Sequence, residues 1–400
     1  MKFSVLLPTR NRKELLAKAI ETVRLQNYDN WEVIVSDNFS EEDIEAYVNS
    51  LSDHRIKYYR TPEFIPVTEN WNNALKYCDG DYIIMLGDDD CILQDYFSTL
   101  KQLIEKNSYP DFVYTNALLY AYPGVLPEVP DGFLRNYGNR SLFKGKTEPY
   151  LLSKEKAIDL VDNSLNFRVT FDYNMQFSLV SKKIVEKLEK YGNFYQSPYP
   201  DYYASNALFL KSDRILIVPR PLVAIGISPK SFGYYYFNDQ EVVGSSFLKN
   251  IPDPEVYNRI KHVVLPGSNM NTSWLLSMET LVKNFASEYK VNLSYDRYRR
   301  LQICSVYSLS LLGNKNSLNM LKELKSNISS YENIRYCLFL EKVLRKIPAI
   351  VRNRFVNYLT SLVDSHPKVD MPKIDGKFDT VLDVFSQIDS EKQLKIATSK

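Results

Sequence analysis

Apolar runs and amphipathic stretches alternate over the first 120 residues, a pattern typical of a sheet whose strands are linked by helices packed on it. Apolar residues recur at helical spacing after the first run, for example at Leu16, Ile20 and Val23. Residues 81–86 (DYIIML) are wholly apolar after the first two, as expected for a strand buried on both faces. The pattern predicts strands over residues 3–7, 31–36, 55–59, 81–86 and 111–119, and helices near 15–23, 69–77 and 95–106.

The pattern changes further along the chain. Residues 123–149 are rich in Pro, Gly and aromatic residues and show no clear period, which predicts a long loop. Later segments favour helices over 154–163, 182–191, 274–285, 298–312 and 336–344, and one or two strands over 214–227, interrupted at Pro219 and Pro221. We therefore predict an α/β fold in residues 1–245, with a Rossmann-like mixed sheet flanked by helices, followed by a mainly helical domain in residues 246–400.

Charge supports a boundary in this region. The whole chain carries 50 basic and 48 acidic residues, and a net charge of +2 gives no reason to expect nucleic-acid binding. The first 250 residues have a net charge of −5, however, whereas residues 251–400 have a net charge of +7. The 30 tyrosines suit half-buried strands, and they also suit grooves that hold polar ligands such as sugars.

Signals for secretion, membrane insertion and zinc binding are not found in the sequence. Residues 1–8 hold too short an apolar run for a signal peptide, and no stretch of 18 predominantly apolar residues occurs. The four cysteines are scattered without a CxxC pair, and the three histidines are far apart in the sequence. We expect a cytoplasmic protein with reduced thiols.

Three consecutive aspartates, Asp88, Asp89 and Asp90, follow the apolar run of residues 81–86 directly. Neighbouring carboxylates raise each other's pKa, and a divalent cation removes that repulsion. Mg²⁺ and Mn²⁺ prefer one or two carboxylates together with substrate phosphate oxygens. The end of a strand in an open sheet is also where ligands bind. A metal site is therefore predicted, although a solvated turn, with Gly87 allowing the bend, would give the same pattern.

Other ligand sites with aspartates or glycines at strand ends are poorly supported. The spaced ligands of an EF-hand are missing, and neither GxGxxG nor GxxxxGK[ST] occurs in the chain. An aspartyl-phosphate phosphatase would require DxDxT after the first strand, where this chain has Pro8, Thr9 and Arg10. These absences favour a site in which a cation, and not a Gly-rich loop, neutralises a diphosphate.

Four short motifs carry a resemblance to a known family: SVLLPTRNR, EVIVSDNFS, ENWNNAL and GDYIIMLGDDD. In this order and spacing they resemble the family 2 glycosyltransferases with the GT-A fold, over about residues 2–92 and more faintly to about residue 230. The resemblance implies inverting transfer of a sugar from a nucleoside-diphosphate donor, with a UDP-sugar favoured and Mn²⁺ or Mg²⁺ as cofactor. It also implies a glycan or lipid-linked glycan acceptor, in the synthesis of a bacterial surface polysaccharide.

The same resemblance assigns the donor-binding residues. Pro8, Thr9 and Arg10 correspond to the strand end that holds the base and ribose, and Asp37 to the acidic residue that hydrogen-bonds the base. Asn70 corresponds to the Asn of an Ala-Arg-Asn stretch near the diphosphate. Two positions depart from the family pattern, because Asn38 replaces a second Asp and Glu69 replaces the Arg. The departures leave the identity of the base and the diphosphate contact open.

The resemblance also assigns the metal ligands and the base. Within the family's Asp-x-Asp motif we expect Asp90 on the metal, Asp88 as the second ligand and Asp89 on the ribose or donor sugar. An inverting transfer needs a general base beside the acceptor hydroxyl. The family places it at a helix start about 100 residues further on, where this chain has Asp201, with Asp172 as a second candidate. Asp201 could instead cap that helix.

The remaining sequence leaves several alternatives open. Residues 342–359 are basic and amphipathic, which suits peripheral contact with the inner face of the cell membrane. A solvated basic face used for packing or homo-oligomerisation is the interpretation that we favour for them. For the chain as a whole, the alternative to an enzyme is a non-catalytic scaffold that binds nucleotide-sugars or glycans. A nucleotidyltransferase is the rival among enzymes.

Overall fold

A computed structural model describes residues 1–137, 141–229, 231–237, 243–244, 246, 249, 252–311, 317–346 and 371–398. The chain divides into two compact units. The first unit comprises Met1–Asp159, Phe171–Ile251 and Val369–Lys400, and the second comprises Leu160–Thr170 and Pro252–Lys368. The predicted basic segment of residues 342–359 falls largely outside the described residues.

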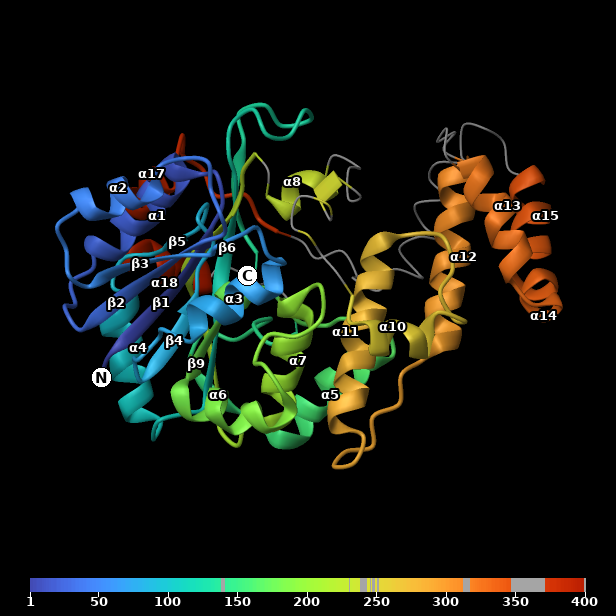
Figure 1. The fold of residues 1–400 in the computed structure, drawn as a ribbon, viewed down its shortest axis with the longest axis horizontal. Helices are drawn as coiled ribbons and strands as arrows, with labels where there is room; N and C mark the ends of the chain where they lie inside the picture. Colours follow the sequence, from blue (N-terminus) through green and yellow to red (C-terminus); the bar gives the residue numbers. More distant parts are fainter. Residues whose placement is uncertain are drawn as a thin grey trace. The chain divides into compact units, whose positions relative to one another are not determined.

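The described residues of the first unit form a ten-stranded mixed sheet (Figure 1). Its central order is β3-β2-β1-β4-β9-β6-β10-β5, while β7 pairs with β6 and β8 with β10. The strands are β1 (Phe3–Thr9), β2 (Trp31–Asp37), β3 (Ile56–Arg60), β4 (Tyr82–Met85), β5 (Cys91–Ile92), β6 (Phe112–Ala121), β7 (Phe133–Asn136), β8 (Tyr150–Leu152), β9 (Ser178–Ser181) and β10 (Ile215–Ile227). β1, β2, β3 and β4 run parallel, and the antiparallel β9 separates β4 from β6.

Helices lie against the strands of this sheet. The helical segments that lie wholly or partly in the first unit are α1 (Lys13–Arg24), α2 (Ile44–Ser50), α3 (Val67–Leu75), α4 (Tyr96–Lys106), α5 (Lys154–Leu165), η1 (Met175–Phe177), α6 (Lys182–Leu188), η2 (Glu189–Tyr191), α7 (Pro200–Lys211), α8 (Phe232–Phe237), α17 (Val381–Gln387) and α18 (Ser390–Thr398). α1 buries Leu16, Ala19, Ile20 and Val23, the face that the sequence pattern predicts.

The register of the parallel strands brings several polar residues to one edge of the sheet. Thr9 at the end of β1 is the partner of Asp37 at the end of β2. β4 ends beside them, because Leu86 N donates to Leu6 O of β1. β10 runs parallel to β6 and ends at the same edge. The loops that leave these strands therefore meet where open sheets bind ligands.

The second unit is helical in its described residues. Its helices are α10 (Pro254–Ile260), α11 (Asn269–Phe285), α12 (Tyr295–Leu311), α13 (Ser317–Asn327), α14 (Ser330–Glu332), η3 (Asn333–Cys337) and α15 (Leu338–Lys346). A core forms between α12, α13 and α15 around Ile303, Val306, Leu324 and Leu340. In the part of the chain that the structure describes, no helix is long and apolar enough to cross a membrane. The predicted fold class, a mixed sheet flanked by helices and followed by a helical region, is confirmed.

Residues 371–398 differ from the sequence-based division of the chain, which placed them with the helical domain. α17 packs against α1 and β5, and α18 packs against β10. Arg220 of β10 donates to Gln393 Oε1 at 2.7 Å and to Ser390 Oγ at 2.8 Å. α17 has only seven residues, which is too short for its periodicity to indicate this return to the sheet.

Candidate functional site

Asp90 organises the turn that follows β4. Its Oδ2 atom accepts hydrogen bonds from Gly87 N at 2.7 Å and Gln176 Nε2 at 2.6 Å, and its Oδ1 atom accepts one from Gly226 N at 2.7 Å. Burial, together with the neighbouring charge of Asp89, raises the pKa of Asp90 to about 7. Both oxygens are thus occupied by groups of the protein, and the side chain joins the turn to η1 and β10.

Asp88 and Asp89 converge on one cation, the guanidinium of Arg12. Arg12 Nη1 lies 2.8 Å from Asp88 Oδ1, and Arg12 Nη2 lies 2.8 Å from Asp89 Oδ2. Thr9 Oγ1 donates to Asp88 Oδ2 at 2.7 Å, and Ser228 Oγ donates to Asp89 Oδ2 at 2.5 Å. Burial raises the pKa of Asp88 to about 6 even though Arg12 opposes the shift. Burial alone would lower the pKa of Arg12, but Asp88 and Asp89 raise it above its usual value.

These contacts bear on which aspartates could hold a metal. Among the described residues, no three His, Cys, Asp or Glu side chains gather as a metal-binding group. Asp88 and Asp89 nevertheless direct carboxylate oxygens at one cationic position, and two carboxylates completed by substrate oxygens suit Mg²⁺ or Mn²⁺. Asp90 differs from them, because its oxygens accept bonds from neutral N–H groups of the protein and, within the described ranges of the chain, face no cation. The assignment of the metal to Asp90 stays a prediction, and the geometry favours Asp88 with Asp89.

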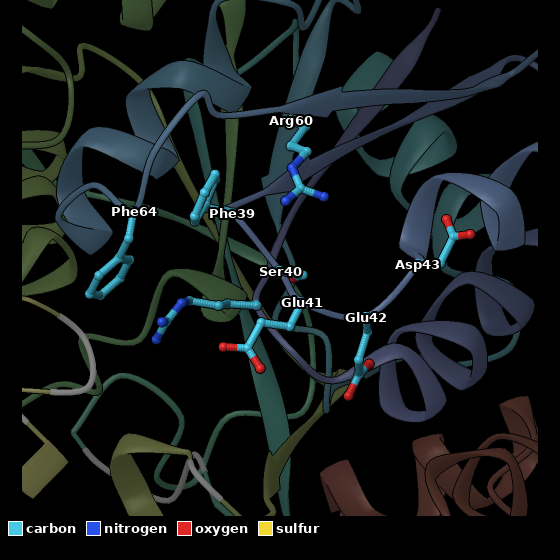
Figure 2. A pocket seen from close by; sticks show the side chains of 8 residues that line it. Phe39, Ser40, Glu41, Glu42, Asp43, Arg60 and Phe64 are labelled. Carbon is cyan, nitrogen blue, oxygen red and sulfur yellow. The ribbon is translucent and has the colours of Figure 1, made fainter.

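A pocket of about 600 Å³ opens beside this edge, at the ends of β1, β2 and β3 (Figure 2). Arg10, Phe39, Ser40, Glu41, Glu42, Asp43, Arg60 and Phe64 line it. The Arg10 guanidinium lies 3.8 Å from the centre of the Phe64 ring, and that of Arg60 lies 5.1 Å from the Phe39 ring. The aromatic faces suit a ligand with a flat ring, the two arginines and three acidic residues of the lining offer it polar contacts, and the volume suits a small molecule.

The other predicted donor residues lie around this pocket in different roles. Pro8 is half-buried at the end of β1, and Thr9 binds Asp88. Asp37 is fully buried, where its carboxylate accepts from Ser40 N at 2.9 Å and from Tyr58 Oη at 2.7 Å. Asp37 therefore shapes the loop that carries Phe39 to the pocket, and its contact with a base stays a prediction.

Asn70 faces the neighbouring strand in this structure. Its Oδ1 atom accepts from Ser36 Oγ at 2.8 Å, and its Nδ2 atom donates to Ser36 O at 3.3 Å. The side chain is 3% exposed. It joins α3 to β2, and its contact with a diphosphate also stays a prediction.

Asp201 lies in the first turn of α7, directly after Pro200. Its Oδ1 atom accepts from Tyr202 N at 3.0 Å, while Tyr199 holds the N-cap position of the helix. Burial raises the pKa of Asp201 to about 7. A carboxylate with this pKa can accept a proton near neutral pH.

Asp172, the second candidate base, lies deeper in the protein. Its side chain is 2% exposed, and its backbone N–H and carbonyl both bond the hydroxyl of Tyr114. Asp201 is half-buried, whereas Asp172 is almost fully buried. An acceptor hydroxyl can therefore reach Asp201 more readily than Asp172.

One segment links the aspartate turn to Asp201 through η1. Gln176 of η1 donates to Asp90, and Tyr173 three residues earlier packs edge-on against Tyr202, with ring centres 4.4 Å apart. Tyr202 is the residue after Asp201, so that the proposed base and the aspartate turn are tied to the same short segment.

A second segment makes the same link from the end of β10. Ser228 donates to Asp89, and Phe232 packs edge-on against Tyr199 with ring centres 5.3 Å apart. Tyr199 precedes Asp201 by two residues. The aspartates and the pocket thus lie at one edge of the sheet, and the segment that carries Asp201 is joined to the aspartate turn through Tyr199 and Tyr202.

The sequence-based reasoning did not single out Arg12, Gln176, Gly226 or Ser228. The position of Arg12 in the sequence could have indicated its role. It is a cation that follows β1 closely, and β1 pairs in parallel with β4, the strand that precedes the aspartates. The other three lie 86 to 139 residues from their aspartate partners, and no local motif marks them.

Comparison with known proteins gives consistent matches to glycosyltransferases. Residues 4–156 match the family described as Glycosyl transferase family 2. A Campylobacter jejuni protein, GalNAc(5)-diNAcBac-PP-undecaprenol beta-1,3-glucosyltransferase, is 39% identical over 104 residues, which are 25% of this chain and 34% of the relative. The Escherichia coli UDP-Glc:alpha-D-GlcNAc-diphosphoundecaprenol beta-1,3-glucosyltransferase WfgD is 30% identical over 113 residues, which are 28% of this chain and 44% of the relative.

These matches are partial. The chain spans about a third to a half of the length of these two curated relatives. Among solved structures, S. aureus TarS 1–349 in complex with UDP-GlcNAc covers 84% of this chain and 93% of its own, with 13% identity and a TM-score of 0.47. A TM-score at this level does not by itself establish a common fold.

Proposed function

Residues 4–156 belong to glycosyl transferase family 2, and from this we propose that the chain transfers a sugar from a nucleoside-diphosphate donor, preferably a UDP-sugar, to a hydroxyl group of a lipid-linked glycan. The observation that supports the proposal is that two features lie at one sheet edge and a third is joined to them through the contacts of Tyr199 and Tyr202. These are the pocket between Phe39 and Phe64, the convergent carboxylates of Asp88 and Asp89, and the candidate base Asp201.

The pocket would take the nucleoside. A base can stack on the ring of Phe39 or Phe64, because every base offers a flat aromatic face. Arg10 and Arg60 line the same pocket and can bind a negatively charged donor. Thr9 and Asp88 lie at the neighbouring strand end, which directs the diphosphate from the pocket toward the aspartate turn.

The leaving group sets the charge requirement at that turn. When the bond to the sugar breaks, the electron pair stays on the diphosphate oxygen. A Mn²⁺ or Mg²⁺ ion held by Asp88 and Asp89 would neutralise this charge as a Lewis acid. Asp90 would keep the turn in place through its bonds to Gly87, Gln176 and Gly226.

Asp201 would act on the acceptor. Its carboxylate takes the proton of the acceptor hydroxyl while the hydroxyl oxygen bonds to the anomeric carbon on the face opposite the diphosphate, which inverts that carbon. A carboxylate with an ordinary pKa near 4 would be a weak base at neutral pH, whereas the raised pKa of Asp201 suits the step. Tyr199 and Tyr202 flank it with rings that stack on each other, and both side chains are buried, so they would hold Asp201 in position.

The acceptor class follows from the two relatives, whose names specify diphosphate-linked undecaprenol substrates. A lipid-linked acceptor places the reaction at the inner face of the cell membrane, and the synthesis of a surface polysaccharide would be its purpose. The basic residues 342–359 would supply peripheral contact with anionic lipids or an oligomer interface.

A transfer assay tests the proposal. The chain is incubated with radiolabelled UDP-sugars, Mn²⁺ and undecaprenyl-diphosphate-linked N-acetylglucosamine, and labelled lipid is separated by chromatography. We expect labelled product and released UDP. Asp201→Asn should abolish the product and keep UDP binding, whereas Asp213→Asn, the same change at an exposed position after α7, should be silent.

Two outcomes would refute the proposed activity. Tight UDP binding without transfer to any lipid-linked acceptor would make the chain a non-catalytic binding protein. Release of pyrophosphate in place of UDP would make it a nucleotidyltransferase.

A further inference from the structure

We propose that Arg12 is a built-in counter-ion that occupies the cation position between Asp88 and Asp89 in the donor-free protein, so that a divalent cation binds there only by displacing it. The inference rests on the proposed function for its purpose, but it concerns the ion equilibrium of the protein itself. It predicts that the free protein binds Mn²⁺ weakly and that the nucleotide and the cation bind cooperatively.

The contacts of Arg12 support an exchange of cations. Its two terminal nitrogens each lie 2.8 Å from a different carboxylate, a bridging arrangement that leaves no room for a second cation between them. The same side chain also donates to Ser228 Oγ, which itself bonds Asp89. A divalent ion that used Asp88 Oδ1 and Asp89 Oδ2 would take the same two oxygens.

The free-energy cost of burying the Arg12 side chain at this position supports the view that a metal ion can displace it. Its side chain is 12% exposed, and its Nε atom is buried without a hydrogen-bond partner among the described residues. A buried N–H group that lacks a partner opposes burial, and the cost disappears when the side chain moves to water. The position is therefore held by the two carboxylates and Ser228, and not by a full set of partners for the guanidinium.

A second ion-pair cluster in the same unit shows the contrast. Glu32 accepts from Lys2, Lys57, Ser4 and Asp79 N, all between 2.6 and 2.9 Å, at the opposite end of the strands from the pocket. Asp79 also pairs with Lys2 and Lys57, so that two cations balance two carboxylates in this cluster. At the aspartate turn, two carboxylates with Asp90 beside them share one cation, which leaves an excess of negative charge for an incoming metal–diphosphate complex.

Exchange of the two cations has a thermodynamic consequence. Mn²⁺ alone must break both ion pairs of Arg12 and gains only two carboxylate ligands. Mn²⁺ that arrives with a diphosphate also gains phosphate oxygens, and the released guanidinium can bind the added negative charge. UDP should therefore tighten Mn²⁺ binding, and Mn²⁺ should tighten UDP binding by the same factor.

A titration of the full chain with Mn²⁺ alone tests the inference. Free Mn²⁺ is followed by its electron paramagnetic resonance signal for the unmodified protein, Arg12→Gln and Arg24→Gln. Arg24 is the last residue of α1, whose N-cap is Arg12, and among the described residues its ion pair is with Glu21, so Arg24→Gln removes equal charge away from the site. We expect Arg12→Gln to bind Mn²⁺ about tenfold more tightly, a coupling of ordinary size, and Arg24→Gln to match the unmodified protein.

Two further variants connect the gain to the site. Asp89→Asn added to Arg12→Gln should remove the tighter binding. Arg12→Lys should bind Mn²⁺ more tightly than the unmodified protein but less tightly than Arg12→Gln, because one ammonium group lacks the fork that reaches both carboxylates. If Arg12→Gln fails to fold, the result with Arg12→Lys decides.

The opposite results overturn the inference. Unchanged or weaker Mn²⁺ binding by folded Arg12→Gln, or by Arg12→Lys if that variant must decide, would show that Arg12 is only a structural partner of the aspartates. The titration needs no turnover, so that a failure of the transfer assay leaves its result intact. Conversely, measured transfer with unaltered Mn²⁺ binding in the variants would reject the role of Arg12 and keep the proposed function.

Discussion

Gly226 of β10 lies so close to the aspartate turn that any side chain there should disturb the site. A Cβ atom added at this position would lie 2.1 Å from the carbonyl oxygen of Asp89 and 2.9 Å from its carbonyl carbon. Both are backbone atoms, which cannot rotate away. We therefore predict that Gly226→Ala separates β10 from the turn.

The magnitude follows from two effects. Overpacking a well-packed position costs about 1–3 kcal/mol, and separation weakens the 2.7 Å bond from Gly226 N to the Asp90 carboxylate, worth about 1.5–3 kcal/mol. The effects overlap, so we expect a loss of about 3 kcal/mol in the free energy of unfolding. That loss corresponds to a fall of about 6 °C in the unfolding midpoint. UDP binding in the presence of Mn²⁺ should weaken at least about tenfold, since 1.4 kcal/mol already gives that factor.

Differential scanning calorimetry and isothermal titration with UDP and Mn²⁺ measure the two effects. Gly233→Ala is the matched control, because its added Cβ would meet Ile227 Cγ1 at 3.4 Å, an ordinary contact. Gly233 also lies in α8, where alanine is favoured over glycine. If Gly226→Ala keeps both the midpoint and the UDP affinity of the unmodified protein, the close approach of β10 to the turn is wrong.

Three further predictions concern acid–base chemistry, stability and the returning helices. The turnover rate should rise with pH through about 7 and then level off, because Asp201 must be unprotonated to act as the base; a flat profile would count against it. Glu32→Gln should lower the free energy of unfolding by about 2 kcal/mol at neutral pH, discounted because its lysine partners are partly exposed. Although burial alone would raise it, bonds from Lys57 and its neighbours lower the pKa of Glu32 to about 2. The advantage should therefore decline progressively as pH falls from about 4 to about 2, and a difference that persists in urea titrations below pH 2 would contradict this. Arg220→Ala should speed proteolytic cleavage within residues 381–398, since the bonds to Gln393 and Ser390 are lost, and an unchanged cleavage rate would contradict the packing of α18.

The sequence predicted the elements whose signals are local. The apolar runs of β1, β2 and β4 and the buried face of α1 are where the pattern placed them. β10 is one continuous strand, although Pro219 and Pro221 suggested an interruption. The sheet accommodates these prolines through register shifts between Val218 and Val223, where the ladder is already irregular.

The missed elements depend on distant pairing. β9 has only four residues and lies antiparallel between β4 and β6, so that neither its length nor its periodicity distinguishes it from a loop. The three aspartates are likewise equivalent by sequence alone. Their roles differ because Asp90 accepts a hydrogen bond from Gly226, 136 residues away, and holds the turn in place. Asp88 and Asp89 instead face the cation of Arg12.

The return of α17 and α18 to the sheet has a consequence for biosynthesis. Gln94, four residues after Asp90, donates to Phe385 O at 2.9 Å and accepts from Gln393 Nε2 at 3.1 Å. The ribosome makes these partners almost 300 residues after the turn that they support. A nascent chain that already contains every motif of residues 4–156 would therefore still lack the contacts of Gln94 with α17 and α18, next to the aspartate turn. Competence to bind the donor should appear only after residues 381–398 have left the exit tunnel.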